Sequence, residues 1–347
     1  MQFMLIAHAK NRLLVFLVAM VLGPMGTEQA ISQVAGPPSD GKLAGATKHI
    51  PAKDDINAIG TRQISGNGAG NWYSLASELR MGREYSRELE SQVKLLNDPI
   101  VTEYINRIGQ TLARNSDARI PFTIKVIDSD EVNAFTLPGG FLYVYSGLIL
   151  AADDEAELAG AMAHEIAHVA ARHATRQMTR SNLITLLSVP LIFVGGGIAF
   201  AVESMSQAMV PLALSKFSRS FEAEADYFGL QYMYVVGYDP EALISFFEKV
   251  QVLEREKPRT LSRAFASHPQ TADRVKKSQL EIKRILPARG QYIVTTSDFD
   301  LVKTRLRGLQ EQREEKQIAV PILRRTQTAA SDSEEQGPPV LKRRTQN

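Results

Sequence analysis

The chain contains no cysteine in its 347 residues. That absence excludes disulfide bonds, thiolate metal ligands and thiol nucleophiles together, and it fits an oxidising compartment, where a free thiol is a liability. An excess of one charge is also lacking. The formal net charge is +2, with basic and acidic residues interspersed, so nothing indicates a nucleic-acid partner. The length suffices for one good core with a small appendage.

Residues 1–30 predict export. Lys10 and Arg12 precede an apolar run, 13–22, that a Gly-Pro pair ends. A charged start before an apolar run of this length is typical of a secretory signal, and the run is too short for a comfortable transmembrane helix. The pattern of a cleavage site is weak, so these residues are either a signal peptide or an uncleaved N-terminal anchor.

Composition divides the rest of the chain into a linker, a folded domain and a tail. Residues 31–70 are rich in glycine, proline, serine and alanine without apolar periodicity, which predicts a flexible linker. Residues 317–347 mix proline, serine, glutamine and both charges, which is typical of a disordered tail. Between them, 71–316 is expected to form one domain, and the sequence shows no internal repeat.

Periodicity within that domain predicts an α+β fold that is mostly helical with a small sheet. An aspartate and a proline at residues 98 and 99 supply a cap and a first turn for one of the helices. Alternating apolar residues favour the strands. Helices are expected over 75–96, 98–112 and 239–254 and near the C-terminus, strands over 122–127, 141–145 and 292–295, and a short extended piece over 133–140.

One pentapeptide, His-Glu-Ile-Ala-His at 164–168, predicts a metal site. It lies on a helix that Asp153 or Asp154 caps and that is expected to run to about Met178. His164 and His168 are four apart, so both face the same side and can hold one zinc ion. Glu165 can take a proton from the water that this zinc holds. The alternative is an amphipathic helix whose histidines only cap or pack.

A third ligand is needed, because a catalytic zinc site has three protein ligands and one open position. Glu222 and Asp226 are four apart on a helix that Ser218 or Ser220 caps and that Gly237 ends. Glu222 completes a His-His-Glu set, and Asp226 can accept the free ring N–H of a zinc-bound histidine. The alternative for this pair is a solvated helix face. Glu224 is expected to face away, and His173 is excluded as a ligand because it lies off the ligand face.

With these residues the chain resembles the gluzincin peptidases of the CaaX prenyl endopeptidase and HtpX-like family. The soluble, periplasmic BepA-like branch is more similar than the multi-spanning HtpX-like branch. The resemblance covers about residues 75 to 285 and implies a gluzincin-type metallopeptidase domain with an edge strand beside the zinc helix. Besides the zinc motif and Glu222-x-x-Ala225-Asp226, it includes Asn133-Ala134-Phe135, Pro138-Gly139-Gly140, Ser218-Arg219, Gly237-Tyr238-Asp239-Pro240 and Ser267-His268-Pro269.

The resemblance implies further roles for some of these residues. Glu165 would be the general base, and residues 133–135 (Asn133, Ala134 and Phe135) would pair with an extended substrate; an ordinary edge strand is the alternative. His268 would approach the zinc to gate it or to steady the oxyanion, unless it is a turn residue. Arg219, just before the helix of Glu222, is a candidate either to steady the oxyanion or to support the ligands from behind. BepA-like proteins often carry tetratricopeptide repeats after the peptidase domain. The residues that follow the domain here are too few for such an array, so docking of partner proteins through repeats is not expected.

An apolar segment, 183–214, separates the ligands along the sequence, and its part 183–202 is long enough to span a bilayer. A single span would put His168 and Glu222 on opposite sides of a membrane. We therefore expect a lid over the cleft or a segment that touches a membrane leaflet.

Together these patterns predict an exported or periplasmic zinc-dependent metalloendopeptidase with one Zn²⁺ per chain. Its polypeptide substrates would be extended or misfolded envelope proteins, and membrane contact would come through 183–202 or an uncleaved N-terminus. One alternative is a latent or chaperone-like quality-control protein whose zinc is mainly structural. A second, an integral membrane processing enzyme, would need several spans that the sequence does not supply.

Overall fold

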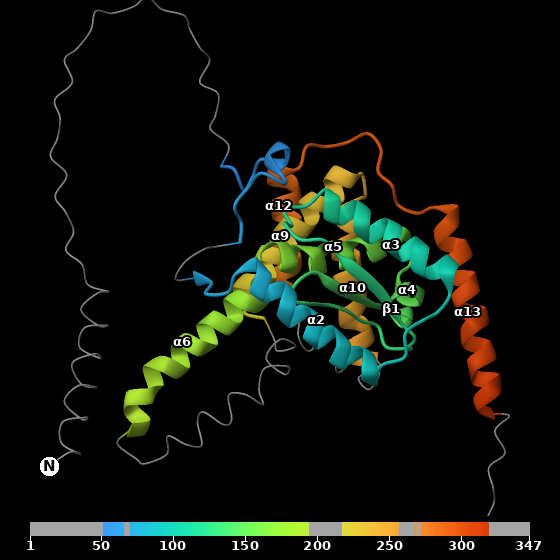
Figure 1. Cartoon of the computed structure of the whole chain (residues 1–347). Helices are drawn as coiled ribbons and strands as arrows, with labels where there is room; N and C mark the ends of the chain where they lie inside the picture. The colour runs from blue at the N-terminus through green and yellow to red at the C-terminus, as the bar shows by residue number, and fades with distance from the viewer. Residues whose placement is uncertain (1–50, 66–69, 194–216, 257–267, 269–271, 319–347) are drawn as a thin grey trace, which may run out of the picture. The chain divides into compact units, whose positions relative to one another are not determined.

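Helices form most of the described chain and surround a small sheet (Figure 1). The computed structural model describes residues 51–65, 70–193, 217–256, 268 and 272–318. Its helices are the 3₁₀ helix η1 (Ile56–Ala58), α2 (Leu75–Gln92), α3 (Pro99–Arg114), α4 (Ser146–Ala151), α5 (Glu155–Ala170), α6 (His173–Phe193), α9 (Arg219–Val236), α10 (Glu241–Glu256), α12 (Ala272–Ile285) and α13 (Ser297–Ile318), and its strands are β1 (Thr123–Ile127), β2 (Ala134–Leu137) and β3 (Phe141–Tyr145).

The sheet has the order β1-β3-β2, so β2 is an edge strand among the described residues. β1 runs parallel to β3, whereas β2 runs antiparallel to it, with Phe135 opposite Tyr143. Those two rings stack with centroids 5.3 Å apart, a cross-strand contact that fixes the register. α5 packs against β2, and α3 packs against β1. The expected α+β fold, with an edge strand beside the helix of residues 164–168, is confirmed.

α5 is the central helix of the domain, and every one of its residues is buried. It packs against α9, α10, α3 and β2. Alanine and glycine supply much of its surface, which lets neighbouring helices approach closely. At Gly160, for example, an added β-carbon would lie 3.2 Å from the α-carbon of Leu243 in α10. A buried helix at the centre gives the side chains of residues 164–168 a rigid support.

The helix ends follow their local sequence. Asp154 caps α5 by accepting a hydrogen bond from the Glu157 N–H at 2.8 Å. Ser218 caps α9 in the same way, and Gly237 ends that helix with a φ of 104°, a left-handed conformation that favours glycine. Asp98 caps α3 as expected.

The predicted continuation of the central helix to Met178 is wrong. α5 ends at Ala170, and a new helix, α6, begins at His173. Ala171 and Arg172 lie between them, and Arg172 has a φ of 56°, the one positive φ among the described non-glycine residues. No helix can pass through that conformation, so α6 leaves α5 in a new direction and extends away from the other helices (Figure 1).

The linker expected over 31–70 is also corrected in part. Residues 51–65 pack on the domain, where Arg62 is buried and its guanidinium lies 2.6 Å from the Asp117 carboxylate. A buried ion pair between distant residues leaves no trace in local composition.

The expected strand over 292–295 is reduced to an isolated bridge between Ile293 and Tyr238. The expectations for residues 1–30, the rest of the linker and nearly all of 317–347 lie outside the described residues.

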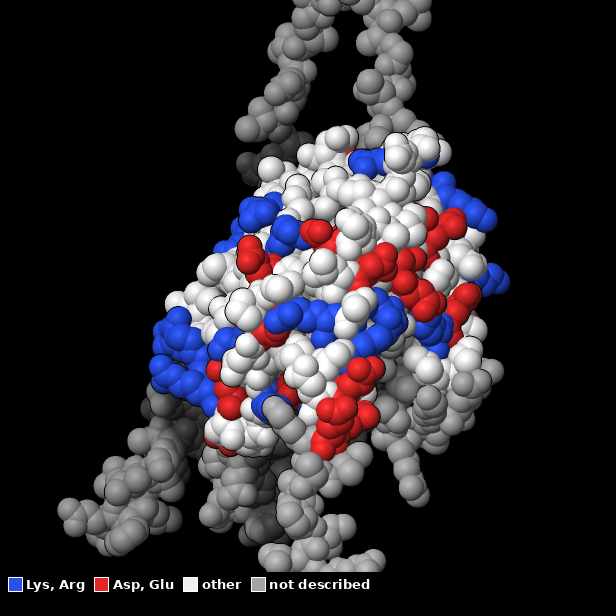
Figure 2. Space-filling view, turned by 90° about the vertical axis from the view of Figure 1, so that its right-hand side faces the viewer, with Lys and Arg blue, Asp and Glu red and all other residues white. Residues whose placement is uncertain are grey.

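The apolar segment is described only in part, because α6 covers residues up to Phe193 and 194–216 lie outside the described chain. Leu183 and Ile184 are exposed on α6. None of the helices in the described ranges combines the length and the apolar character needed to cross a membrane. On the face that carries α13, basic and acidic side chains lie intermixed (Figure 2).

Candidate metal centre

Four side chains from three parts of the chain converge on one buried point. His164 and His168 come from α5, Glu222 from the first turn of α9, and His268 from the segment before α12. All four are at most 5% exposed, and one ligand atom from each lies within 4.8 Å of the others.

The distances among the ligand atoms fit a small cation. The Nε2 atoms of His164 and His168 lie 3.0 Å apart. Glu222 Oε2 lies 3.6 Å from His164 Nε2, and Glu222 Oε1 lies 3.5 Å from His168 Nε2. Nitrogen ligands about 2.0–2.1 Å from a tetrahedral zinc ion stand about 3.3 Å from each other. Two imidazoles and a carboxylate at this spacing therefore suit zinc, and the donor set is the one that the sequence predicts.

His268 adds a fourth side chain, whose distances to the other ligand atoms are similar to those among the first three. Its Nδ1 lies 3.4 Å from His164 Nε2 and 3.0 Å from Glu222 Oε1. Its other nitrogen, Nε2, lies 3.4 Å from Glu165 Oε1. His268 therefore stands between the ligand cluster and the candidate base.

An acidic residue and an arginine support His164 from behind. Asp226 Oδ1 lies 2.9 Å from His164 Nδ1, and Arg274 Nη2 lies 2.6 Å from the same oxygen. Burial opposes charge on His164, but Asp226 and Glu222 raise its pKa to about 9. Burial alone would also raise the pKa of Glu222, yet His268 and His164 hold it well below its usual range. A metal ion bound there would displace the proton that these carboxylates hold on His164, because a ligating histidine is neutral.

His168 has a different environment. Burial lowers its pKa well below the usual range, which keeps the imidazole neutral, as a metal ligand must be. Its Nδ1 lies 2.9 Å from Nδ1 of His173, which is fully buried and whose pKa burial lowers to about 4. His173 is not part of the four-residue cluster, in agreement with its exclusion as a ligand. Glu224 faces away from the cluster, as expected, and lies 3.0 Å from His173 Nε2.

The candidate base, Glu165, lies between the cluster and the edge strand. Thr136 of β2 donates a hydrogen bond to Glu165 Oε2 at 3.2 Å. A small hollow of about 20 Å³ adjoins Glu165, with room for about one water molecule. Its lining is apolar except at the site itself, and consists of Ala134, Leu148, Ala161, His164, Glu165, Phe246, Phe247 and His268.

The arginine near the carboxylates is not the one that the sequence suggested. Arg219 is the first residue of α9 and is exposed. Arg274 of α12 is buried instead, and its guanidinium reaches both Glu222, at 3.0 Å, and Asp226. Nothing in the sequence around Arg274 marks it, because its role depends on how α12 packs against α9. Of the residues to which the resemblance gives a substrate-binding role, Asn133 lies just before β2, and 134–135 lie in that strand.

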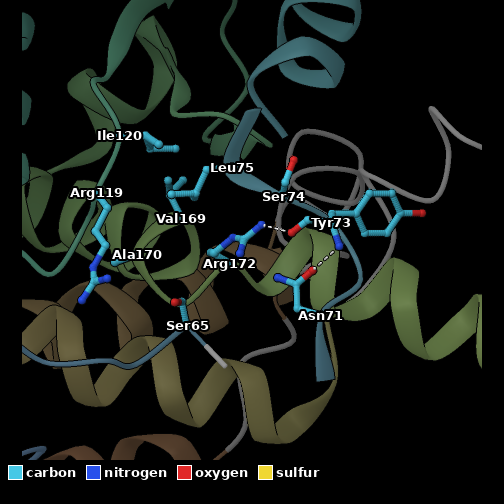
Figure 3. A pocket seen from close by; sticks show the side chains of 10 residues that line it. All are labelled: Ser65, Asn71, Tyr73, Ser74, Leu75, Arg119, Ile120, Val169, Ala170 and Arg172. Atoms are coloured by element: carbon cyan, nitrogen blue, oxygen red, sulfur yellow. Dashed lines mark hydrogen bonds between the residues drawn. The ribbon is translucent and has the colours of Figure 1, made fainter. Parts of the chain in front are cut away.

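A larger cavity of about 270 Å³ lies beyond the end of α5 (Figure 3). Arg172 borders it, and its guanidinium donates to the Tyr73 carbonyl at 2.6 Å and to Glu78 Oε2 at 2.7 Å. These bonds tie the segment before α2 to the break between α5 and α6. The cavity is lined by Ser65, Asn71, Tyr73, Ser74, Leu75, Arg119, Ile120, Val169, Ala170 and Arg172.

Comparisons with known proteins agree with this geometry. Residues 99–281, which contain the whole cluster, match the profile of peptidase family M48. The chain is 33% identical over 256 residues to the beta-barrel assembly-enhancing protease of Escherichia coli (strain K12), an alignment that covers 70% of this chain and 51% of that protein. It is 30% identical over 213 residues to the mitochondrial metalloendopeptidase OMA1 of Schizosaccharomyces pombe, covering 60% of this chain and 61% of that protein. It is 31% identical over 221 residues to the metalloprotease LoiP of Escherichia coli (strain K12), covering 60% of this chain and 83% of that protein. The chain thus spans about half the length of the beta-barrel assembly-enhancing proteases that it matches.

Proposed function

Because the chain belongs to peptidase family M48, we propose that it is a zinc-dependent metalloendopeptidase that hydrolyses peptide bonds of extended or misfolded cell-envelope proteins. One observation carries this proposal: Glu165 lies beside a buried cluster of two imidazoles and a carboxylate with the spacing of zinc ligands. A purely structural zinc site has no need of a carboxylate base at its edge.

In this proposal His164, His168 and Glu222 would hold one zinc ion per chain, and the bound ion would supply Lewis-acid chemistry at the scissile carbonyl and a lowered pKa for water. Glu165 takes a proton from the attacking water at its carboxylate and delivers it to the leaving amine. The hydrogen bond from Thr136 holds the carboxylate of Glu165 in place for both transfers. Asp226 positions the ring of His164.

In this proposal the substrate binds along the outer edge of β2, which pairs with no other strand among the described residues. A peptide there adds a strand to the sheet, and main-chain hydrogen bonds hold it without regard to its side chains, which suits extended or misfolded chains. Residues 133–135 provide this edge. The envelope location draws on the predicted signal in residues 1–30 and on relatives named for beta-barrel assembly. Apolar residues 183–202 are the candidate membrane contact.

The alternative, a latent or chaperone-like protein, is favoured by one specific observation. His268 Nδ1 lies among the ligand atoms, 3.4 Å from His164 Nε2 and 3.0 Å from Glu222 Oε1, so His268 would supply a fourth protein ligand in place of water. Replacing His268 with alanine separates the two views. A rise in peptidase activity supports latency imposed by His268, and a fall supports a role for His268 in steadying the oxyanion.

The test of the main proposal is zinc content beside peptidase activity. We expect about one zinc per purified chain, clear loss of zinc in Glu222→Gln, and normal zinc with abolished cleavage of unfolded casein in Glu165→Gln. Glu248→Gln, which changes an exposed glutamate of α10, is the matched control and should alter neither quantity. A parent chain that takes up no zinc even when the metal is supplied would refute the proposal.

A further inference from the structure

The first turns of α9 carry three acidic residues at alternate positions, 222, 224 and 226. Glu222 reaches the ligand cluster, and Asp226 lies directly behind His164, with Oδ1 2.9 Å from Nδ1. Glu224 points to the other side of the helix. The two α5 histidines of the cluster therefore differ at Nδ1: His164 has the Asp226 carboxylate there, whereas the Nδ1 of His168 faces another histidine, His173.

A second histidine connects His168 to Glu224. His173 Nδ1 lies 2.9 Å from His168 Nδ1, and His173 Nε2 lies 3.0 Å from Glu224 Oε2. Arg176 Nη1 lies 3.0 Å from the same carboxylate oxygen and balances its charge. The result is a continuous line of polar contacts from the cluster, through two buried rings, to a carboxylate at the surface side of α9.

The break between α5 and α6 makes this line possible. On an unbroken helix His173, five residues after His168, would point well away from it. The left-handed Arg172 turns the chain, so that the first residue of α6 comes back behind His168. Packing then fixes both rings. His173 stacks on Phe221 at 4.4 Å, and His168 stacks on Phe217 at 4.2 Å.

The chemistry of the contacts assigns the protons along the line. An ionised carboxylate only accepts hydrogen bonds, so His173 donates from Nε2 to Glu224. A neutral His173 then has a lone pair at Nδ1, and His168 must donate its Nδ1–H to it. That leaves the lone pair of His168 at Nε2, the atom that faces His164 Nε2 and Glu222 in the cluster.

We infer that His173, held by Glu224, is a positioning residue that keeps His168 in the Nδ1–H tautomer and so presents its Nε2 to the metal. This inference rests on the proposed zinc site and adds to it a second support that differs from the direct Asp226 contact at His164. His173 lies outside the four-residue ligand cluster and acts through His168, so its effect is expected in metal affinity before it is seen in catalysis.

Three substitutions at position 173 separate the hydrogen bond from the packing. His173→Phe retains a ring against Phe221 but has no acceptor for His168. His173→Asn places an oxygen close to the position of Nδ1 and retains the acceptor. His173→Gln can still donate to Glu224 but lacks the acceptor beside His168. The quantity to measure is the zinc dissociation constant of the full chain by chelator competition, with thermal unfolding of the metal-free protein as the check on folding.

We expect zinc affinity to fall about 10–100-fold in the Phe and Gln variants and to stay within a few-fold of the parent in the Asn variant. Equal affinity in the parent and in His173→Phe would overturn the inference, as would equal loss in the Asn and Gln variants. Should His173→Phe fail to fold, the comparison of Asn with Gln decides. A parent that binds no zinc would contradict the proposed function itself, an outcome distinct from a parent that binds zinc without needing His173.

Discussion

Gly229 of α9 lies directly against the backbone of His164 in α5. A β-carbon at position 229 would come within 3.2 Å of the His164 nitrogen and 3.3 Å of its α-carbon. Glycine is therefore what lets the helix that carries Glu222 approach the helix that carries the two histidines. The distance between the two halves of the cluster depends on this contact.

Gly229→Ala should push α9 away from α5. We expect a loss of about 1–3 kcal/mol in the free energy of unfolding, as for other overpacked cores, together with weaker zinc binding. Denaturant unfolding and chelator competition measure the two effects. Gly308→Ala is the matched control, because Gly308 also lies in a helix but has nothing within 4 Å of an added β-carbon. That change should stabilise the protein by up to about 1 kcal/mol, and destabilisation by both variants would contradict the packing argument.

At Arg172, glycine should give a more stable protein than alanine, which is the reverse of the order that helix propensity predicts. Glycine and alanine at this position both remove the bonds to Glu78 and Tyr73, but only glycine adopts a φ of 56° without strain. Arg172→Gly is therefore expected to be more stable than Arg172→Ala by about 1–2 kcal/mol. The same pair at Arg83, an exposed residue of α2, should show the reverse order by about 1 kcal/mol. Thermal unfolding of the four variants tests this, and the same order at both positions would disprove the strain.

Arg274→Met should make the protein depend on metal for its stability. Without the guanidinium, the buried carboxylates of Glu222 and Asp226 lose the arginine that they share and keep only their histidine contacts; breaking a buried ion pair typically costs about 3–5 kcal/mol. Zinc bound at Glu222 offsets part of that loss. The rise in Tm on adding zinc should therefore be larger in the variant than in the parent. Arg284→Met, which removes an exposed pair with Asp54, should leave Tm and its response to zinc nearly unchanged.

Glu281 should lower stability as the pH rises. Burial, and then the negative charge of Asp226, raise the pKa of Glu281 from 4.5 to about 7. The folded state thus binds more protons than the unfolded state between these values, so the free energy of unfolding falls as the pH rises through this window. Glu281→Gln removes this dependence. We expect it to raise Tm at pH 8 and to have little effect at pH 4; an equal shift at both values would argue against the raised pKa.

The parts of the fold that depend on neighbouring residues were predictable from the sequence. Caps such as Asp154 and Ser218, the glycine end of α9 and the spacing of His164 and His168 all express contacts within a few residues. Periodicity likewise marked β1 and β3, the strands before and after β2 in the sequence. The position of Glu222 followed from chemistry, because two histidines leave a zinc site one ligand short.

What the sequence did not reveal depends on contacts between distant residues or on backbone strain. The positive φ of Arg172 has no compositional signal, and without it the place of His173 behind His168 could not be derived. Arg62 and Arg274 look like ordinary charged residues until their carboxylate partners are brought to them. In each case the feature depends on the tertiary fold, and the neighbouring residues in the sequence do not indicate it.

The ligand cluster also has a consequence for fragments of the chain. His164 and His168 precede residues 194–216, whereas Glu222 and His268 follow them. A single cut in that interval divides the ligands between two polypeptides, neither of which has enough of them for a complete site. Because α9 packs on α5 through noncovalent contacts such as that of Gly229 with His164, we expect the two pieces to reassemble as a noncovalent complex. Recovery of zinc binding on mixing would then report the reassembly.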